Sequence, residues 1–480
     1  MPVSKQLKLQ HLLWRTGFGP ATADWKSWES RPESTWWSKI KEFSTGQPEY
    51  YDVADNAVKG LLLGAGEIGR MESDNLDKDK KRQVRRQSRE DLRNLNVRWL
   101  NEMIYSKAQL REKMALFWHG HFASRNINIL YQQQLLDIIR KNALGNFGDL
   151  LRAVSKSAAM LAFLNNQQNK KQHPNENFAR EVMELFTLGR GNYTENDIKE
   201  AARAFTGWGY ELNGDFVFRR RAHDEGSKTV LGQTGPFDGD DVLDILLRQP
   251  QTAVYITRKI YRFIVNEEIV PEDRIQALAT RFFQRQYSIT GLLDDIVGSP
   301  WFYAPENIGA RIKSPVELWV GLRRTLPFEP QDPLSQILVQ NALGQTLFYP
   351  PNVAGWPGGR TWIDASSLML RLRLPQLVAW QGDFNVSTKD DDDQNMGEGD
   401  ALRDRQKRLV SEVNWTPVLD LFGKTPDAQL AEQMARYLWQ LPEARPPLDV
   451  MEEHTDRSSR DKRIKTTFMQ LMATPEFQLC

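Results

Sequence analysis

Apolar side chains recur every three or four residues along most of the chain, a spacing that places them on one face of an α-helix. Leu92, Leu95 and Trp99 form one such face. Later in the sequence the same spacing predicts helices around residues 252–265, 272–286, 315–325, 333–344, 366–380 and 427–440. The pattern therefore predicts a mainly α protein, a large multi-helix globular body.

Two helix starts carry strong local signals. Thr194 and Ser314 each stand three positions before a carboxylate, Asp197 and Glu317 respectively, which is the arrangement of a capping box. Pro315 adds a residue that is favoured at the first helical position. The sequence predicts that helices begin at these two points.

One β element is predicted within the helical pattern. Asn213 and Gly214 lie between two short runs of alternating character, which is the strongest short-range signal for a β-hairpin. Residues 229–231 are a candidate third strand. We therefore expect a small β insertion near 208–232.

Two segments have the composition of surface loops. Residues 383–400 contain four consecutive aspartates followed by Gly and polar residues, and 441–463 combine three prolines with a run of charge. We expect residues 1–382 to form the main helical domain and 383–400 a flexible acidic loop. Residues 401–480 are then a helical segment packed on the main domain.

Composition narrows the partners and the location. Lys and Arg number 63 against 62 Asp and Glu, so no overall charge favours nucleic acid or an anionic membrane. No apolar stretch approaches the roughly 20 residues that span a bilayer, and the first residues contain no run of signal-peptide length. We therefore expect a cytoplasmic protein without a transmembrane segment. The single cysteine, Cys480, excludes an intrachain disulfide.

Two further motifs lack the context that would give them a function. Residues 80–93 hold seven basic and two acidic side chains without aromatic residues, which is typical of a solvated helix face rather than a nucleic-acid site. Gly64, Gly66 and Gly69 match the dinucleotide-binding spacing, but no buried strand precedes them and no second strand follows. We interpret this motif as a loop.

Two histidines close together are candidate metal ligands. His119 and His121 flank Gly120 at the end of an amphipathic helix. On a continuous helix, side chains two positions apart point about 200° apart, so the two rings would not meet at one ion. A helix that ends at Gly120 would let them converge. The alternative for His121 is that it continues the buried face as a hydrogen-bonded core residue.

Residues 175–189 form a predicted helix with a charged side. Glu181 and Glu184 are three apart and share a face, where they would act as paired catalytic carboxylates or as metal ligands. Arg180 would orient a carboxylate or bind an anionic substrate. The alternative is that Arg180 and Glu184 form an ordinary ion pair on the helix surface, which implies no function.

A third candidate group follows the predicted hairpin. His223 and Asp224 are adjacent, and such a pair in a turn can supply a metal ligand or a general base. The alternative is a turn held by an Asx-type hydrogen bond.

Several of these motifs, taken in order, resemble a bacterial family called domain of unknown function 1800. They comprise His11 to Pro20, Phe117 to Phe122, Asn175 to Glu181, Glu184 to Gly189, Ala204 to Trp208, His223 to Lys228 and Asn352 to Gly359. The resemblance runs from about residue 9 to 375, with a weaker ending at 475–477. Because several separate motifs occur in the same order, the resemblance is highly specific.

The resemblance implies little about chemistry, because the family has no agreed catalytic residues to carry over. It implies a large helical fold. Many family members carry export signals, so a periplasmic or extracellular location is the alternative to a cytoplasmic one. Members are often encoded beside a family similar to secreted sulfatases, which implies a sulfatase-like protein as a partner.

Two functions follow from these observations. The first is a non-catalytic partner or scaffold of an exported hydrolase-like system. In that case the polar motifs form buried hydrogen-bond networks that maintain the fold, and Trp208, Trp356 and Trp362 build surface or interdomain contacts.

The second is a metal-dependent hydrolase. Its ion would be Zn, Mn or Fe, because His and carboxylate side chains suit these metals. The metal ligands would be His119, His121 and His223, and the catalytic residues would be Arg180, Glu181, Glu184 and Asp224. His11 is a further candidate for the same cleft.

Overall fold

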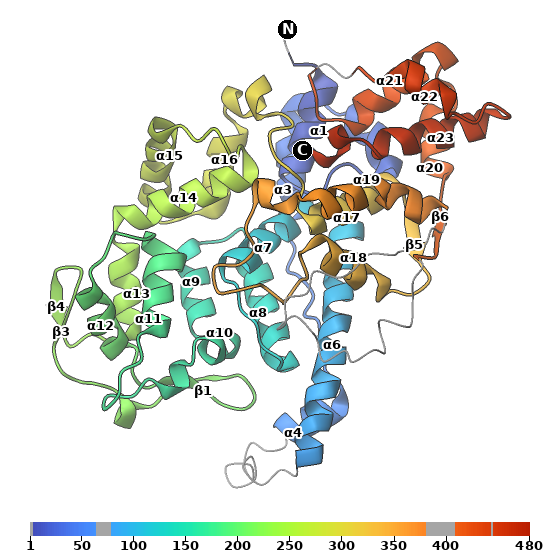
Figure 1. The fold of residues 1–480 in the computed structure, drawn as a ribbon. Coiled ribbons are helices and arrows are strands. Elements are labelled where there is room, and N and C mark those ends of the chain that lie inside the picture. The colour runs from blue at the N-terminus through green and yellow to red at the C-terminus, as the bar shows by residue number, and fades with distance from the viewer. Residues whose placement is uncertain (1–2, 64–77, 381–408, 443–444) are drawn as a thin grey trace.

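Helices dominate the computed structural model, as the sequence predicts; it describes residues 3–63, 78–380, 409–442 and 445–480 (Figure 1). The first helices are α1 (Lys5–Arg15), α2 (Trp25–Glu29), α3 (Glu33–Phe43), α4 (Asn56–Leu63), α6 (Lys78–Tyr105), α7 (Gln109–His121), α8 (Ile129–Asn142), α9 (Phe147–Ser155) and α10 (Ala158–Phe163). In Figure 1, α6 runs downward out of the body, and α4 lies against its far end.

The middle of the chain forms a second group of helices, on the left in Figure 1. It comprises α11 (Asn177–Glu181), a π-helix (Val182–Leu188), α12 (Glu195–Ala204), α13 (Gly239–Leu247), α14 (Pro250–Ile264), α15 (Glu272–Gln284) and α16 (Ile289–Val297). The remaining helices are α17 (Pro315–Thr325), α18 (Ser335–Leu343), α19 (Ala365–Ala379), α20 (Thr416–Phe422), α21 (Asp427–Leu438), α22 (Leu448–Glu453) and α23 (Arg460–Met472). The six helices expected from residue 252 onward all form.

The described strands form three separate two-stranded antiparallel sheets. β1 (Trp208–Tyr210) pairs with β2 (Phe216–Phe218), as Asn213 and Gly214 predict, and Gly214 has the positive φ of +93° that such a turn favours. β3 (Lys228–Val230) is not a third strand of that sheet, because it turns back at Gly232 and pairs with β4 (Gln233–Gly235). The third pair, β5 (Phe328–Pro330) with β6 (Ser411–Val413), joins strands far apart in the sequence and was not predicted.

Two loop predictions have different outcomes. Residues 441–463 were predicted as a surface loop, but they contain α22 and the first turn of α23. The prolines that suggested a loop, Pro446 and Pro447, instead lie directly before α22, where a proline does not interrupt helical hydrogen bonds. The acidic segment 383–400 and the glycine motif at 64–69 lie outside the described residues.

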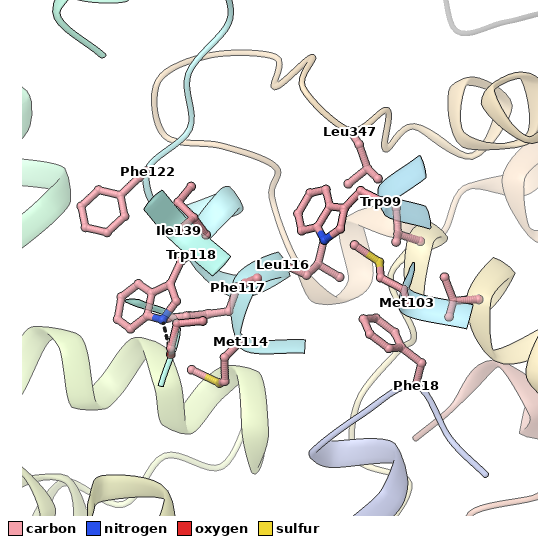
Figure 2. Close-up of a cluster of buried hydrophobic side chains, with 14 of the residues drawn as sticks. Phe18, Trp99, Met103, Met114, Leu116, Phe117, Trp118, Phe122, Ile139 and Leu347 are labelled. Atoms are coloured by element: carbon pink, nitrogen blue, oxygen red, sulfur yellow. Dashed lines mark hydrogen bonds between the residues drawn. The ribbon is translucent and has the colours of Figure 1, made fainter. Parts of the chain in front are cut away.

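Buried side chains of α7 occupy the middle of the molecule. Its apolar residues contact several other elements, and the indole of Trp118 donates a hydrogen bond to the carbonyl of Ala143 (Figure 2). Unusually for a core helix, Glu112 and Lys113 are also fully buried. Buried charges require partners. Glu112 has them in Arg111 and Arg140, at 2.9 and 3.0 Å.

Both predicted capping boxes form, at Thr194 with Asp197 and at Ser314 with Glu317. The second has a further role, because Glu317 lies in a central charge cluster that also contains Lys113, Arg311 and Glu267. Lys113 donates a hydrogen bond to Glu317, and the Arg311 guanidinium lies 3.5 Å from the same carboxylate oxygen and 3.3 Å from Glu267. Although burial opposes ionisation, these two cations hold the pKa of Glu317 well below its usual value.

Segments far apart in the sequence meet at this cluster. Lys113 also donates to the carbonyl of Trp14 in α1, at 3.2 Å. Residue 312 forms an antiparallel bridge with Leu479, and the ammonium of Lys313 donates to the carbonyl of Phe477 at 2.6 Å. The cluster therefore joins α1, α7, the start of α17 and the last described segment. Among the described helices, none has both the length and the apolar character needed to cross a bilayer.

We predict that Glu317→Gln lowers the free energy of unfolding by about 3–5 kcal/mol, because it leaves Lys113 and Arg311 buried without their shared anion. Glutamine keeps the size of the side chain and removes its charge. The measurement is urea unfolding followed by tryptophan fluorescence. The matched control is Glu432→Gln in the exposed pair with Arg436, where we expect a loss of about 0–1 kcal/mol. Equal losses in the two variants would show that the cluster does not support the fold.

Candidate functional site

His119 is buried in an aromatic cage near the end of α7. Its ring centroid lies 5.1 Å from Trp99, 5.0 Å from Phe348 and 5.5 Å from Trp356. Its Nε2 accepts a hydrogen bond from the backbone N–H of Phe348 at 3.1 Å. Burial lowers the pKa of His119 to about 3, so the ring is neutral. The lone pair that a metal would need is already engaged.

His121 points to a different set of neighbours. Its ring lies against Phe122, Phe147 and Phe186, and its Nε2 donates to the carbonyl of Phe186 at 3.2 Å. Burial, together with the charge of Lys259, lowers its pKa well below 6.5. This placement is the core-residue alternative considered from the sequence.

The two rings do not converge, because α7 continues through Gly120 to His121. The proposed helix end at Gly120 is therefore wrong. The close approach at this point requires Gly355 and not Gly120: a Cβ on Gly355 would overlap the Gly120 carbonyl, whereas a Cβ on Gly120 would meet no atom within 4 Å. Gly355 also has a φ of +81°, which favours glycine. The segment 352–362 therefore packs directly against the end of α7.

Arg180, Glu181 and Glu184 lie where α11 passes into the π-helix. π-Helical segments are rare in proteins, and those that occur often lie at functional sites. Arg180 does not pair with Glu184. It binds Glu176 at 3.1 Å and Glu195 at 2.7 Å, which connects α11 to the start of α12.

The two carboxylates of this group differ in their surroundings. Glu184 accepts hydrogen bonds from Tyr193 and from Arg190, and these lower its pKa. Glu181 forms no hydrogen bond or ion pair with the described residues. Burial and then the charge of Glu184 raise its pKa. Of the predicted catalytic residues, Glu181 alone combines a free carboxylate with a perturbed pKa.

His223 and Asp224 have structural partners. The Nδ1 of His223 donates to the carbonyl of Thr206 at 2.9 Å. The carboxylate of Asp224 accepts hydrogen bonds from the Nε of Arg203 at 2.7 Å and from the N–H of Gly226 at 2.9 Å. These bonds, and the one from Arg203 above all, lower the pKa of Asp224. The bond from Gly226 is the Asx-type turn considered as the alternative. Together these contacts attach the β3–β4 hairpin to α12.

The remaining predicted contacts are also internal. The ring of His11 packs against Phe302 at 4.6 Å, and burial lowers its pKa well below 6.5. Trp208 and Trp362 are buried, which excludes the surface alternative of the predicted surface or interdomain contacts for these two, and Trp356 is partly exposed. In the described part of the chain, no three His, Cys, Asp or Glu side chains are grouped so that they could hold a metal ion. The metal site stays a prediction.

Two features were missed from the sequence. The first is the central charge cluster, whose only sequence signal was the capping box at Ser314. The second is Lys259 in α14, which has no ion-pair partner among the described residues and lies 5.4 Å from the ring centroid of Tyr255. Burial lowers its pKa to about 8. No short motif indicates the partners of Glu317 or the burial of Lys259, so only the three-dimensional arrangement reveals them.

Comparison with known proteins yields one match. A family model with the description “Protein of unknown function (DUF1800)” matches residues 11–479. No curated protein matches the chain, and no solved structure matches it.

We predict that His119 makes the protein less stable in acid. Its folded pKa of about 3 lies below the unfolded value of about 6.5, so the unfolded chain takes up a proton that the folded ring refuses as the pH falls through this window. His119→Gln retains an acceptor and removes the titration. Between about pH 7 and about pH 5, the wild type should lose about 2 kcal/mol more unfolding free energy than this variant. Urea unfolding at the two pH values measures the difference. Parallel losses would refute a neutral, buried His119.

Proposed function

We propose that this chain, which belongs to the family described as “Protein of unknown function (DUF1800)”, is a non-catalytic partner protein of an exported hydrolase-like system. The expected partner is a sulfatase-like protein, and the expected location is then periplasmic or extracellular. The resemblance described above motivates both the partner and the location.

One observation carries the proposal: most of the polar groups expected to perform chemistry are engaged in holding elements together. Arg180 joins α11 to α12, Asp224 joins a hairpin to α12, and His119 is bonded to the backbone of residue 348. Groups used in this way maintain a fold and are not available to a substrate. Glu181 is the exception, and a single carboxylate does not make a hydrolase site.

The surface that we assign to the partner is the segment 352–362. Asn352, Pro357 and Arg360 are exposed there, while the segment is anchored by the close contact of Gly355 with Gly120 and by the buried Trp362. Binding residues are commonly found on loops that a rigid scaffold positions. Trp356 is partly exposed beside them, and tryptophan and arginine dominate the energy of protein interfaces.

We predict that the chain, carrying a tag and coexpressed with the sulfatase-like protein encoded beside it, retains that protein on affinity resin. Arg360→Glu and Trp356→Ala should each reduce retention by about tenfold or more, because such anchors contribute at least 1–2 kcal/mol, about one power of ten in affinity. The control is Arg190→Glu, whose side chain is 87% exposed and lies beside the π-helix. Failure of the wild type to retain the partner would refute the proposed function. Equal retention by all variants would refute only the assigned surface.

Elemental mass spectrometry of protein purified without chelators tests the opposite possibility. Near-stoichiometric Zn, Mn or Fe that is lost in folded Glu181→Gln would contradict a non-catalytic role. We expect no such metal, because the predicted ligands are engaged elsewhere.

A further inference from the structure

A cavity of about 270 Å³ lies between α1, α2, α3, α17 and residues 104–109, and part of its lining comes from the segment His11 to Pro20. We name it the Arg324 pocket and define it by Leu13, Trp28, Arg31, Phe43, Lys107 and Arg324. It is independent of the proposed function. Its volume is at the small end of the range of about 300–1,000 Å³ that is usual for ligand pockets.

The polar lining of this pocket is dominated by cations. Arg31, Lys107 and Arg324 contribute three positive charges, and Asp24 is the one carboxylate among the lining residues. None of the three cations forms an ion pair with the described residues. Among the other buried arginines, Arg140 and Arg311 have carboxylate partners, whereas Arg15 and Arg371 donate hydrogen bonds to backbone carbonyls. With three cations against one carboxylate, the lining of the pocket keeps a net positive charge.

Arg324 is held rigidly with one side of its guanidinium free. Its Nε donates to the carbonyl of Gly19 at 3.0 Å, and its Nη1 donates to the carbonyl of Ile104 at 2.7 Å. Its Nη2 has no hydrogen-bond partner among the described residues. Burial lowers the pKa of Arg324 to about 10, so it remains charged at neutral pH. A fixed guanidinium with unused N–H groups is preorganised for an oxyanion.

The other wall of the pocket is aromatic and apolar. The rings of Trp28 and Phe43 meet edge to face at 6.2 Å, and Leu13 adds an aliphatic surface. Arg31 lies 5.5 Å from the Trp28 ring centroid, and Lys107 lies 5.9 Å from that of Phe43. Cationic and apolar groups therefore line the same small space. An inorganic anion would use the charge and leave the apolar wall unused.

We infer that the Arg324 pocket binds a small organic oxyanion, a carboxylate or phosphate carried on a single apolar ring. The oxyanion lies against the free side of Arg324, and the ring lies between Trp28 and Leu13. Lys107, at the exposed rim, adds attraction without fixing the orientation. The neutral analogue of the same ligand is rejected, because it leaves the cations of the pocket unpaired.

The probes are para-fluorobenzoate and para-fluorophenyl phosphate, observed by fluorine NMR line broadening at millimolar concentration with the full chain. Benzoate displacement of either probe establishes a shared site. We expect at least one anion to bind, and neutral para-fluorobenzamide not to bind. The probe that binds more tightly distinguishes a carboxylate from a phosphate ligand. Failure of both anions to bind, or equal binding of the amide, would overturn the inference.

Variants locate the binding. Arg324→Gln should weaken it by about tenfold or more, because a charge-assisted hydrogen bond is lost. Arg285→Gln is the control, since it removes an arginine that pairs with Asp295 outside the pocket. If Arg324→Gln does not fold, Ser27→Trp replaces it: Ser27 is an exposed lining residue, and the larger side chain fills the cavity. Unchanged binding in the folded variant would place the anion elsewhere and overturn the assignment.

Discussion

The carboxylate of Glu317 accepts a hydrogen bond from the ammonium of Lys113 and lies 3.5 Å from the guanidinium of Arg311. All three side chains are buried in the core. A buried cation without an anion is several kcal/mol less stable than a solvated one, so the carboxylate of Glu317 stabilises Lys113 and Arg311 in the core. Lys113 is also bonded to Trp14, and Lys313 to Phe477. The positions of α1, α7, α17 and the last described segment therefore depend on one another, because each contributes a partner to these buried charged groups.

The same constraint applies to the buried histidines among the predicted site residues. A histidine in an apolar core is stable when neutral and hydrogen-bonded, and His119 and His121 satisfy both conditions with backbone partners. The ion pairs of Arg180 and Asp224 join α12 to its neighbours. By contrast, Arg324 has a fixed guanidinium and no counter-ion among the described residues. Unneutralised charge beside a cavity is a better indication of a ligand than the identity of a side chain.

Local signals predicted the local features. The capping boxes at Thr194 and Ser314, the hairpin at Gly214 and the helices after residue 252 depend on neighbours within a few positions, and all of them form. Partner choice depends on distant residues and was not predictable: β3 pairs with β4 rather than with the first hairpin. Glu317 was recognised as a helix cap, but nothing near it in the sequence indicates Lys113. The Arg324 pocket likewise draws its walls from four separate stretches.

The bridge between residue 312 and Leu479 has a consequence for biosynthesis. Domains usually fold as units while the chain is being made, beginning with the part that emerges first. Here residues 311 and 313 obtain backbone partners only from residues 478–480, which are translated much later. Until residues 478–480 have been synthesised, residues 311 and 313 of the nascent chain therefore lack these backbone hydrogen-bond partners. Synthesis that stops before residue 478 would leave a molecule with nearly all of the described helices but without these backbone partners for residues 311 and 313.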